Sequence, residues 1–295
     1  MNVLSVKNPF CAPVYYKDAV TSTMDEARKL PDAKDGTVIA AGEQTAGRGR
    51  AGRPWKTAAD ESLSFTVLFR YRSIKSIPHC LTLRAGLAVS LAIEDFTAFA
   101  LNSQTSPLAG RVLVKWPNDV MLPVKDGLGR KAVGILTEAD GGMVYIGIGI
   151  NIAQKSFPPE LAGKACSIAQ ALLDAVKQDG NTNNRNDESA FILLAEKRFT
   201  LLEMILCRLN KELNSLAGVM EWRHKLDDRL FMKGQRVCFI PGAAEELFSF
   251  SKTGLMVKPE KTEGILCGIG DNGEIFITPD SGGIVSFATG EIKIS

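Results

Sequence analysis

The sequence contains little histidine and no paired cysteine motif. Its two histidines, His79 and His224, argue against a His-rich metal site and against a Ser/His/Asp triad. The cysteines are Cys11, Cys80, Cys166, Cys207, Cys238 and Cys267. They include no CxxC pair, and this scattered arrangement indicates free thiols in a reducing compartment instead of a disulfide framework or a zinc site.

Long apolar runs and a strong net charge are also missing. No apolar run reaches the roughly 18 residues that a membrane span needs, and the N-terminus lacks the features of a signal or transit peptide. The net charge of +2 argues against a protein whose whole surface binds nucleic acid, so an electrostatic function would be local. A hydrophobic content of 45% is ordinary for a globular chain. We therefore expect a soluble cytoplasmic protein whose partners include neither a membrane nor a nucleic acid.

The pattern of apolar residues predicts a mixed α/β domain over residues 1–230 and a small β domain over 231–295. Strands are predicted over 13–16, 36–42 and 62–70, and in later runs over 111–120, 131–139 and 143–152. Helical spacing predicts helices over 81–100, 165–177, 191–213 and 217–229. After Gly234, short strands alternate with glycine-rich turns, which is typical of a barrel-type module.

Two local features of the chain allow more specific predictions. A helix is expected after Ser22, with Thr23 and Glu26 spaced as a capping box. The stretch 177–189 is polar, rich in asparagine and free of apolar residues. A segment of this composition buries too little apolar surface to order itself, so we expect it to be mobile or disordered.

The stretch GEQTAGRGRAGRPW, residues 42–55, concentrates positive charge on a loop with many glycines. It holds three arginines and four glycines. Gly47 and Gly52 have the spacing of a P-loop, but Arg53 and Pro54 replace its Lys-Ser/Thr pair, so the motif lacks the hydroxyl that binds magnesium. Arginine forks and accessible backbone amides suit phosphate oxygens, so we interpret the loop as a clamp that folds over an anion. The alternative is an exposed surface loop that touches RNA.

Further polar residues lie at the ends of apolar strands. KWPNDV puts Lys115, Asn118 and Asp119 around a proline-constrained turn, which suits a nucleotide-and-magnesium site and equally a structural turn. RKAVGILTE puts Lys131 at the mouth of an apolar strand, and Gly134 marks a close approach to another group. A solvated strand-end lysine is the alternative there. GIGINI lacks the third glycine of a dinucleotide fingerprint, so we interpret it as tight strand packing with an asparagine at the strand end.

The order and spacing of these motifs resemble those of the biotin–protein ligases. The resemblance runs from about residue 14 to residue 295 and ends on a Gly-Glu-Ile run that is similar to the end of that family's small C-terminal domain. It is carried by Ser22-Thr23, Gln44-x-x-Gly47-Arg48-Gly49-Arg50-x-Gly52-Arg53-x-Trp55, Lys115-Trp116-Pro117-Asn118-Asp119, Lys131-x-x-Gly134-Ile135-Leu136, Gly149-Ile150-Asn151 and Gly290-Glu291-Ile292.

The resemblance implies a fold and a reaction. The fold would be α/β, a mixed sheet with flanking helices like that of class II synthetases, followed by a small SH3-like β-barrel. Biotin and ATP would react, with magnesium, to give biotinyl-5′-AMP and pyrophosphate, and an acceptor lysine would then attack the mixed anhydride to form an amide. The acceptor would be the biotin-carrier domain of a biotin-dependent carboxylase such as acetyl-CoA carboxylase. The ligase itself would be a monomer or a weak homodimer.

The resemblance also implies roles for individual residues. Lys131 would be the main catalytic residue, Arg50 would hold the acyl-adenylate, and Asp119 would bind magnesium. Biotin would be bound by Ser22, Thr23, Gln44, Gly47, Arg48, Gly49, Arg50, Lys131 and Gly134. ATP and the adenylate would be bound by Arg48, Arg50, Arg53, Trp55, Lys115, Asn118, Lys131 and Asn151.

Two departures and two alternatives accompany the resemblance. Met24 stands where the family commonly has asparagine, so it offers biotin no side-chain amide. The chain also begins almost at the catalytic domain, so we expect no helix-turn-helix before it and no repressor activity. The nearest alternative is a lipoate or octanoate ligase or transferase of the same superfamily. The other is a non-catalytic RNA-binding module, which leaves Lys131, the Ser-Thr pair and the C-terminal domain unexplained.

Overall fold

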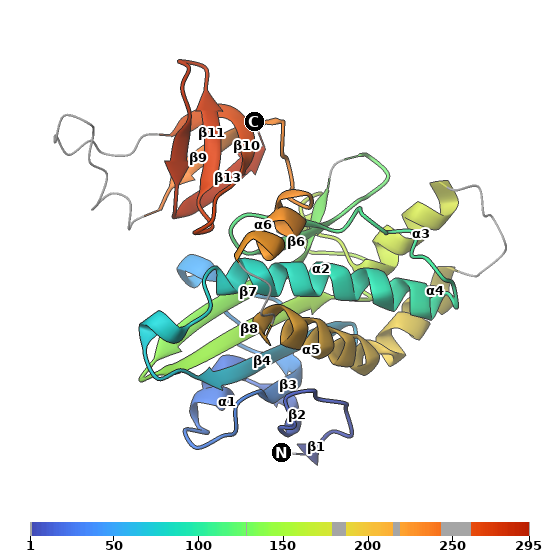
Figure 1. Ribbon diagram of the computed structural model, residues 1–295. Helices are drawn as coiled ribbons and strands as arrows, with labels where there is room; N and C mark the ends of the chain where they lie inside the picture. Colours follow the sequence, from blue (N-terminus) through green and yellow to red (C-terminus); the bar gives the residue numbers. More distant parts are fainter. Residues whose placement is uncertain (1, 128, 179–186, 215–218, 243–260, 295) are drawn as a thin grey trace.

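The main body is built around an eight-stranded mixed sheet with helices on both faces (Figure 1). The computed structural model describes residues 2–127, 129–178, 187–214, 219–242 and 261–294. Across the sheet the strands run in the order β1 (Asn2–Val3), β2 (Val14–Val20), β3 (Thr37–Gln44), β4 (Ser62–Arg70), β8 (Met143–Asn151), β7 (Arg130–Asp140), β6 (Asp119–Leu122) and β5 (Leu113–Lys115). β2 and β3 are parallel, and the other neighbouring strands of this sheet are antiparallel.

Helices cover the two faces of the sheet unequally. On one face, α2 (Leu81–Ala100) and α5 (Arg198–Asn214) lie side by side, and α3 (Ile168–Gln178) and α4 (Asp187–Glu196) extend their layer (Figure 1). The short helix α1 (Thr23–Arg28) packs on the other face, in a separate apolar cluster. Among the residues that the structure describes, no helix is both long and apolar enough to cross a membrane.

The central strands present different side chains to the two faces. In β4, Leu63 and Phe65 point into the core under α2 and α5, whereas Thr66 points to the opposite face, because successive strand residues alternate. In β8, Ile148 lies in the same core and Gly149 faces the other way. One face of the sheet is therefore apolar and tightly packed, and the other carries small and polar residues beside the apolar cluster under α1.

The predicted capping box at the start of α1 is wrong by one residue. Ser22 is the N-cap, and its Oγ accepts a hydrogen bond from the Met24 N–H at 3.2 Å. The Thr23 hydroxyl is instead bonded to neighbouring strands, and the Glu26 carboxylate pairs with two lysine side chains. Tertiary contacts thus take both side chains that would have formed the box.

Two predicted segments end at different residues from those expected. The helical stretch 191–213 is divided at Lys197 into α4 and α5, which both pack into the main core. The stretch predicted to be disordered is helical at its edges, since α3 ends at Gln178 and α4 begins at Asp187. Its central part, 179–186, lies outside the described residues.

A separate antiparallel sheet of five strands follows toward the C-terminus (Figure 1). Its order is β12 (Val285–Phe287), β11 (Ile275–Pro279), β10 (Thr262–Ile269), β9 (Arg236–Pro241) and β13 (Gly290–Ile294). The predicted fold class, an α/β body with flanking helices and a small C-terminal β unit, is confirmed. The division of the chain between residues 230 and 231 stays a prediction.

The two sheets share an apolar cluster centred on Trp116. This residue lies in the turn between β5 and β6, is buried, and donates its indole N–H to the Gly273 carbonyl at 2.9 Å. It packs with Leu87 of α2 and Phe239 of β9. The helix α6 (Val219–Asp227) contacts both α2 and β10. The C-terminal sheet is therefore held against the turn that carries Asn118 and Asp119.

Candidate functional site

A cavity of about 970 Å³ opens on the small and polar face of the main sheet. Its walls come from the β3–β4 loop, the β5–β6 turn, β7, β8, the segment 154–165 and β13. A volume of this size is at the upper end for a small-molecule site. The residues predicted for the site line it together, apart from Gly47: Ser22, Thr23, Gln44, Arg48, Gly49, Arg50, Arg53, Trp55, Lys115, Asn118, Asp119, Lys131, Gly134 and Asn151. Their individual roles stay predictions.

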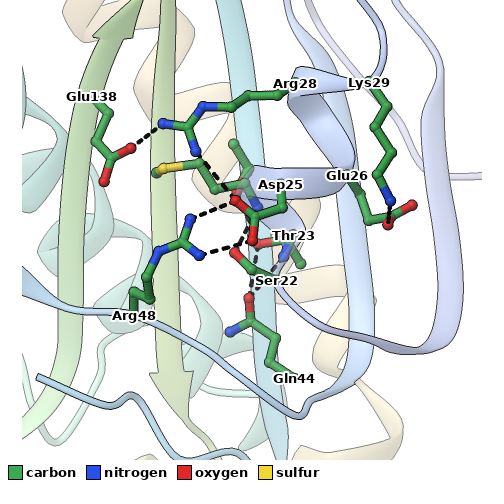
Figure 2. A network of polar contacts seen from close by, with 11 residues as sticks. Ser22, Thr23, Asp25, Glu26, Arg28, Lys29, Gln44, Arg48 and Glu138 are labelled. Carbon is green, nitrogen blue, oxygen red and sulfur yellow. Dashed lines mark hydrogen bonds and ion pairs between the residues drawn. The ribbon is translucent and has the colours of Figure 1, made fainter. Parts of the chain in front are cut away.

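One end of the cavity is a hydrogen-bonded group around the start of α1 (Figure 2). Gln44 Oε1 accepts hydrogen bonds from the Thr23 N–H at 2.9 Å and from the Thr23 hydroxyl at 3.1 Å. The same hydroxyl lies 2.9 Å from that of Thr66 on β4. These bonds fix the carboxamide of Gln44, so neutral donors and acceptors gather at this end in set orientations.

Met24 adds an apolar floor to the same end. Its side chain is 4% exposed and packs with Ala27, Ile39 and Tyr145. A Cβ on Gly147 of β8 would lie 2.9 Å from Met24 Cε, which is closer than such contacts allow, so the glycine leaves room for the thioether. As expected from the sequence, Met24 offers no amide here, and the site has buried apolar surface instead.

The arginine-rich loop is a hairpin that arches over the cavity. The Gly49 N–H donates to the Arg53 carbonyl at 2.7 Å, and the Trp55 N–H donates to the Gly47 carbonyl at 2.8 Å. At its tip, Ala51 has a φ of 53°, a left-handed conformation that non-glycine residues seldom adopt. Gly47 contributes through this backbone bond, although it does not line the cavity.

Arg48 anchors the hairpin to α1 through a chain of charged groups (Figure 2). Its guanidinium donates to both carboxylate oxygens of Asp25, at 2.8 and 2.5 Å. Arg28 donates to the same carboxylate at 3.2 Å and also to Glu138 of β7. The hydrogen bonds from Arg48 hold the pKa of Asp25 below its usual range. Asp25 is thus a charged anchor for the start of the loop.

The other two arginines of the hairpin reach the C-terminal sheet. Arg50 donates to the Gly290 carbonyl at 3.2 Å and lies 3.5 Å from Asn118 Oδ1. Arg53 pairs with the carboxylate of Glu291 on β13. The loop therefore bridges the two sheets, and any ligand beneath it is enclosed by both parts of the molecule.

The indole of Trp55 lies flat against two facing strands. Gly134 of β7 and Gly149 of β8 are directly paired, and a Cβ on either would overlap the Trp55 ring. The close approach predicted at Gly134 is therefore an approach by this indole. Lys131 Nζ lies 5.5 Å from the ring centroid, which is within range of a cation–π contact.

Lys131 and Lys115 form a cationic centre on the cavity wall. Lys131 Nζ is 2.7 Å from Asp119 Oδ1, so the lysine is ion-paired. The alternative interpretation, a solvated lysine at a strand end, does not describe it. Burial lowers the pKa of Lys115, the charge of Lys131 lowers it further, and the charge of Asp119 opposes both effects. A negatively charged ligand would stabilise the charged form of Lys115.

Asp119 is the carboxylate that we predicted to bind a metal ion. In the part of the chain that the structure describes, no three side chains of His, Cys, Asp or Glu gather as a metal site. Magnesium in nucleotide sites is commonly held by one or two carboxylates together with substrate phosphates. Asp119 therefore suits a magnesium ion that binds together with a polyphosphate. The described residues do not form a metal site made of protein ligands alone.

Another part of the cavity wall, which runs from the end of β8 to Leu161, combines amide and apolar side chains. Asn151 ends β8, and Gln154 follows it. Phe157 and Pro158 continue the wall just before the 3-10 helix Pro159–Leu161, and Leu161 at the end of that helix also lines it. A flat heterocycle with polar edges suits such a surface.

Several side chains at the site were missed by the sequence reasoning. They are Asp25, which anchors Arg48, Thr66, which bonds Thr23, Gln154, which bonds Asn151, and Glu291, which pairs with Arg53. The alternation of polar and apolar residues in SLSFTV could have indicated Thr66, because a buried strand with one polar face needs polar partners there. Asp25 and Glu291 depend on contacts between distant segments, and Gln154 bonds Ser62, 92 residues away, as well as the nearby Asn151.

The sequence profile of the biotin/lipoate A/B protein ligase family matches residues 16–151. The bifunctional ligase/repressor BirA of Bacillus spizizenii is 34% identical over 194 residues, which are 62% of this chain and 53% of the relative. The biotin–(acetyl-CoA-carboxylase) ligase of Paracoccus denitrificans is 32% identical over 184 residues, which are 60% of this chain and 68% of the relative. The match thus spans about half the length of the first relative and two thirds of the second.

The fold is similar to that of a solved ligase structure. The biotin protein ligase from Aquifex aeolicus in complex with biotin and ATP superposes with a TM-score of 0.62 at 24% identity. The superposition covers 95% of this chain and 97% of that one. At this identity the similarity establishes the fold alone.

Gly149→Ala tests the contact between Trp55 and the paired glycines. The new methyl group overlaps the indole, so Trp55 should leave its place and become more exposed, at a cost of about 1–3 kcal/mol for overpacking. Tryptophan fluorescence should shift to longer wavelength, because Trp116 and Trp222 stay buried. The control is the same substitution in a Trp55→Phe background, where no shift is expected. An equal shift in that background would show that the indole is not what the methyl group displaces.

Asp25→Asn tests the anchor of the hairpin. Losing the charge should free Arg48 and let the loop open more often, so trypsin should cleave within residues 47–55 faster. For a partly exposed pair worth about 1 kcal/mol, the expected increase is about fivefold. Asp140→Asn, at the exposed end of β7, is the matched control. If both variants are cleaved at the wild-type rate, Asp25 does not hold the loop.

Proposed function

The chain belongs to the biotin/lipoate A/B protein ligase family, and from this premise we propose that it joins biotin to a lysine of an acceptor protein, using ATP. One observation carries the proposal: a single cavity combines a neutral hydrogen-bonding end with a cationic centre. A bicyclic urea with an apolar ring suits the neutral end, and a carboxylate beside a phosphate suits the cationic centre. Biotin supplies the first group and the carboxylate, and ATP supplies the phosphate.

Biotin is held by its ureido group at the start of α1. Ser22, Thr23 and Gln44 offer hydroxyl and amide groups in set orientations, because Thr23 donates to Gln44 Oε1 and the Met24 N–H donates to Ser22 Oγ. Met24 provides apolar contact for the sulfur-containing ring. Arg48 lies beside this end and can contact the ligand from the loop. The valeryl carboxylate then extends toward Lys131.

The first step joins the biotin carboxylate to ATP. A carboxylate oxygen attacks the α-phosphorus, the bond from that phosphorus to the β-phosphate bridging oxygen breaks, and biotinyl-5′-AMP and pyrophosphate result. Both reactants are anionic, so their approach depends on positive charge between them. Lys131 provides it, with Lys115 next to it, and exchanges its ion pair with Asp119 for contact with the reacting oxygens. Arg50 holds the adenylate from above.

Magnesium is expected to accompany ATP. Asp119 would supply a carboxylate oxygen to it, as one protein ligand beside the phosphates. When bound, the ion offsets negative charge on the polyphosphate.

The second step passes biotin to the acceptor. The neutral amine of an acceptor lysine attacks the carbonyl carbon of the mixed anhydride, AMP leaves with the electron pair of the carbon–oxygen bond, and the amine loses a proton as the amide forms. The acceptor we propose is the biotin-carrier domain of a biotin-dependent carboxylase such as acetyl-CoA carboxylase. Enclosure by the hairpin and β13 keeps water away from the anhydride until the acceptor docks.

The deciding experiment incubates the protein with labelled biotin, Mg-ATP and an apo biotin-carrier domain. The expected result is label on the carrier lysine, dependent on ATP, and no label on a carrier in which that lysine is replaced. Parallel reactions with labelled lipoate and octanoate test the alternative within the family. Transfer of lipoate or octanoate in preference to biotin would overturn the proposal, as would no transfer of any of them.

Lys131→Ala tests the catalytic assignment. The variant should fold normally and bind biotin, but biotinyl-AMP synthesis should fall by about 10²-fold or more, because a charge contact made chiefly in the transition state is lost. Pyrophosphate release in the presence of biotin measures this. Lys125→Ala, an exposed lysine on another part of the surface, is the control and should keep wild-type activity. Near-normal synthesis by the Lys131 variant would remove Lys131 from the mechanism.

A further inference from the structure

An ion pair between Glu94 and Arg229 lies outside the cavity and has no part in the proposed chemistry. Glu94 belongs to α2, and Arg229 belongs to the segment 228–235 between α6 and β9, which we call the linker. Arg229 Nη1 donates to Glu94 Oε1 at 2.6 Å and Arg229 Nη2 donates to Glu94 Oε2 at 3.1 Å, so the contact is bidentate. The Arg229 side chain is 18% exposed and that of Glu94 is 13% exposed, so solvent screens this pair less than it screens the ion pairs of the hairpin.

The same two side chains also bond the chain that enters β5. Glu94 Oε1 accepts a further hydrogen bond from the Gly110 N–H at 2.9 Å. Arg229 Nη1 donates a further one to the Val112 carbonyl at 3.3 Å. The next residue, Leu113, begins β5. The ion pair therefore joins α2, the start of β5 and the linker at one point.

The linker lies along the outer edge of β5. This strand is the last in the order of the main sheet, has three residues, and pairs with β6 on its inner side. On its outer side the Val114 N–H donates to the Arg229 carbonyl at 2.8 Å, and the Phe231 N–H donates to the Val114 carbonyl at 2.9 Å. Leu230 lies opposite Val114 in a parallel pairing. The linker therefore supplies the backbone hydrogen bonds that an edge strand would otherwise lack.

The cationic centre of the cavity is built on the chain that the linker contacts. Lys115 is the last residue of β5, and it is paired with Asp119 of β6 in the register of the sheet. Asp119 in turn forms the ion pair with Lys131. The ring of Phe231 lies against Gly129, since a Cβ on that glycine would be 2.5 Å from it. The linker thus contacts the chain immediately before each of the two lysines.

The position of β5 depends on these contacts. A strand of three residues has few bonds of its own, and short edge segments with few contacts open more readily than the core. The reaction is sensitive to such motion, because a catalytic group displaced by about 1 Å can lower the rate about 10²-fold. The bidentate ion pair fixes the linker, and the linker fixes β5.

We propose that Glu94 and Arg229 are positioning residues for the first step, the formation of biotinyl-AMP. Their ion pair holds the linker on β5 and so keeps Lys115 and Asp119 in place beside Lys131. The inference rests on the proposed function in naming this reaction. The neutral end of the cavity is built on α1 and β3, at the other side of the main sheet from β5. A change at the ion pair should therefore lower the rate of the first step and leave the affinity for biotin unchanged.

The test uses the double variant Glu94→Met/Arg229→Met, which removes the pair without leaving either charge unpaired. Replacing a buried ion pair by apolar residues of similar size is often neutral for stability, so the variant should fold. Pyrophosphate release is measured in a single turnover at saturating biotin and ATP, because this rate constant does not depend on the fraction of protein that is folded. It should fall about ten- to a hundredfold. Calorimetry should show biotin affinity equal to that of wild type.

The matched control is the double variant Asp95→Leu/Arg208→Met. Asp95 follows Glu94 on α2, and its carboxylate accepts two hydrogen bonds from Arg208, at 2.7 and 2.8 Å. This pair joins α2 to α5 and not to the linker, so its removal should leave the rate constant unchanged. A wild-type rate constant in the Glu94/Arg229 variant, or an equal loss in the control, overturns the inference.

Arg229→Lys is a milder change, and it decides the question if the double variant does not fold. Lysine keeps the positive charge but cannot bond the Glu94 carboxylate through two parallel N–H groups. The rate constant for pyrophosphate release should fall by about threefold or more, again with unchanged biotin affinity. An unchanged rate constant in this variant contradicts the inference.

Hydrogen exchange tests the hold on β5 in the free protein, without any substrate. The segment 111–122 covers β5, the following turn and β6. Its amides should exchange about tenfold faster in the Glu94/Arg229 double variant than in wild type or in the control, because the linker releases the strand more often. Exchange at the wild-type rate would show that the pair does not hold β5. A wild type that makes no biotinyl-AMP refutes the proposed function and leaves this measurement valid.

Discussion

The alternation of side chains along β4, β7 and β8 is the constraint on which both the core and the site depend. Strand residues face opposite sides in turn, so the apolar set that packs under α2 and α5 fixes which residues are left for the other face. There the sheet presents Thr66, Gly134, Gly147 and Gly149, which are polar or have no side chain. The glycines leave room for Met24 and Trp55 to lie directly on the backbone. A shift of one residue in register would put isoleucines into the cavity and glycines into the core.

Charge in the site is organised by anchoring each arginine of the hairpin to a different part of the molecule. Arg48 is held by α1, Arg50 by the carbonyl of Gly290, and Arg53 by Glu291. These pairs are partly exposed and individually weak, so a polyphosphate can compete for the guanidinium groups. The arrangement keeps positive charge next to the cavity without packing it into the core. It also joins the hairpin to the C-terminal sheet, which shares an apolar cluster with the main body.

Much of the fold and many residues of the candidate site could be predicted from the sequence, because they are indicated by local patterns of residues. Strand and helix periodicity identified the α/β body and the small C-terminal β unit, and motif spacing identified residues that the fold brings to one cavity. What failed or was missed depended on tertiary contacts. The capping box failed because Thr23 bonds Gln44 across the fold. The Asp25–Arg48 pair and the Gln154–Ser62 bond join residues 23 and 92 positions apart, and no local pattern indicates such pairs.

The proposed reaction requires one cavity to bring a carboxylate and the α-phosphate of ATP together on a cationic wall. The most direct test is exchange of labelled pyrophosphate into ATP without any acceptor protein, because exchange requires the carboxylate–phosphate bond to form and break reversibly. We expect exchange that depends on biotin and on Lys131. It is contradicted if wild type shows no exchange with biotin, or if exchange proceeds equally when biotin is left out.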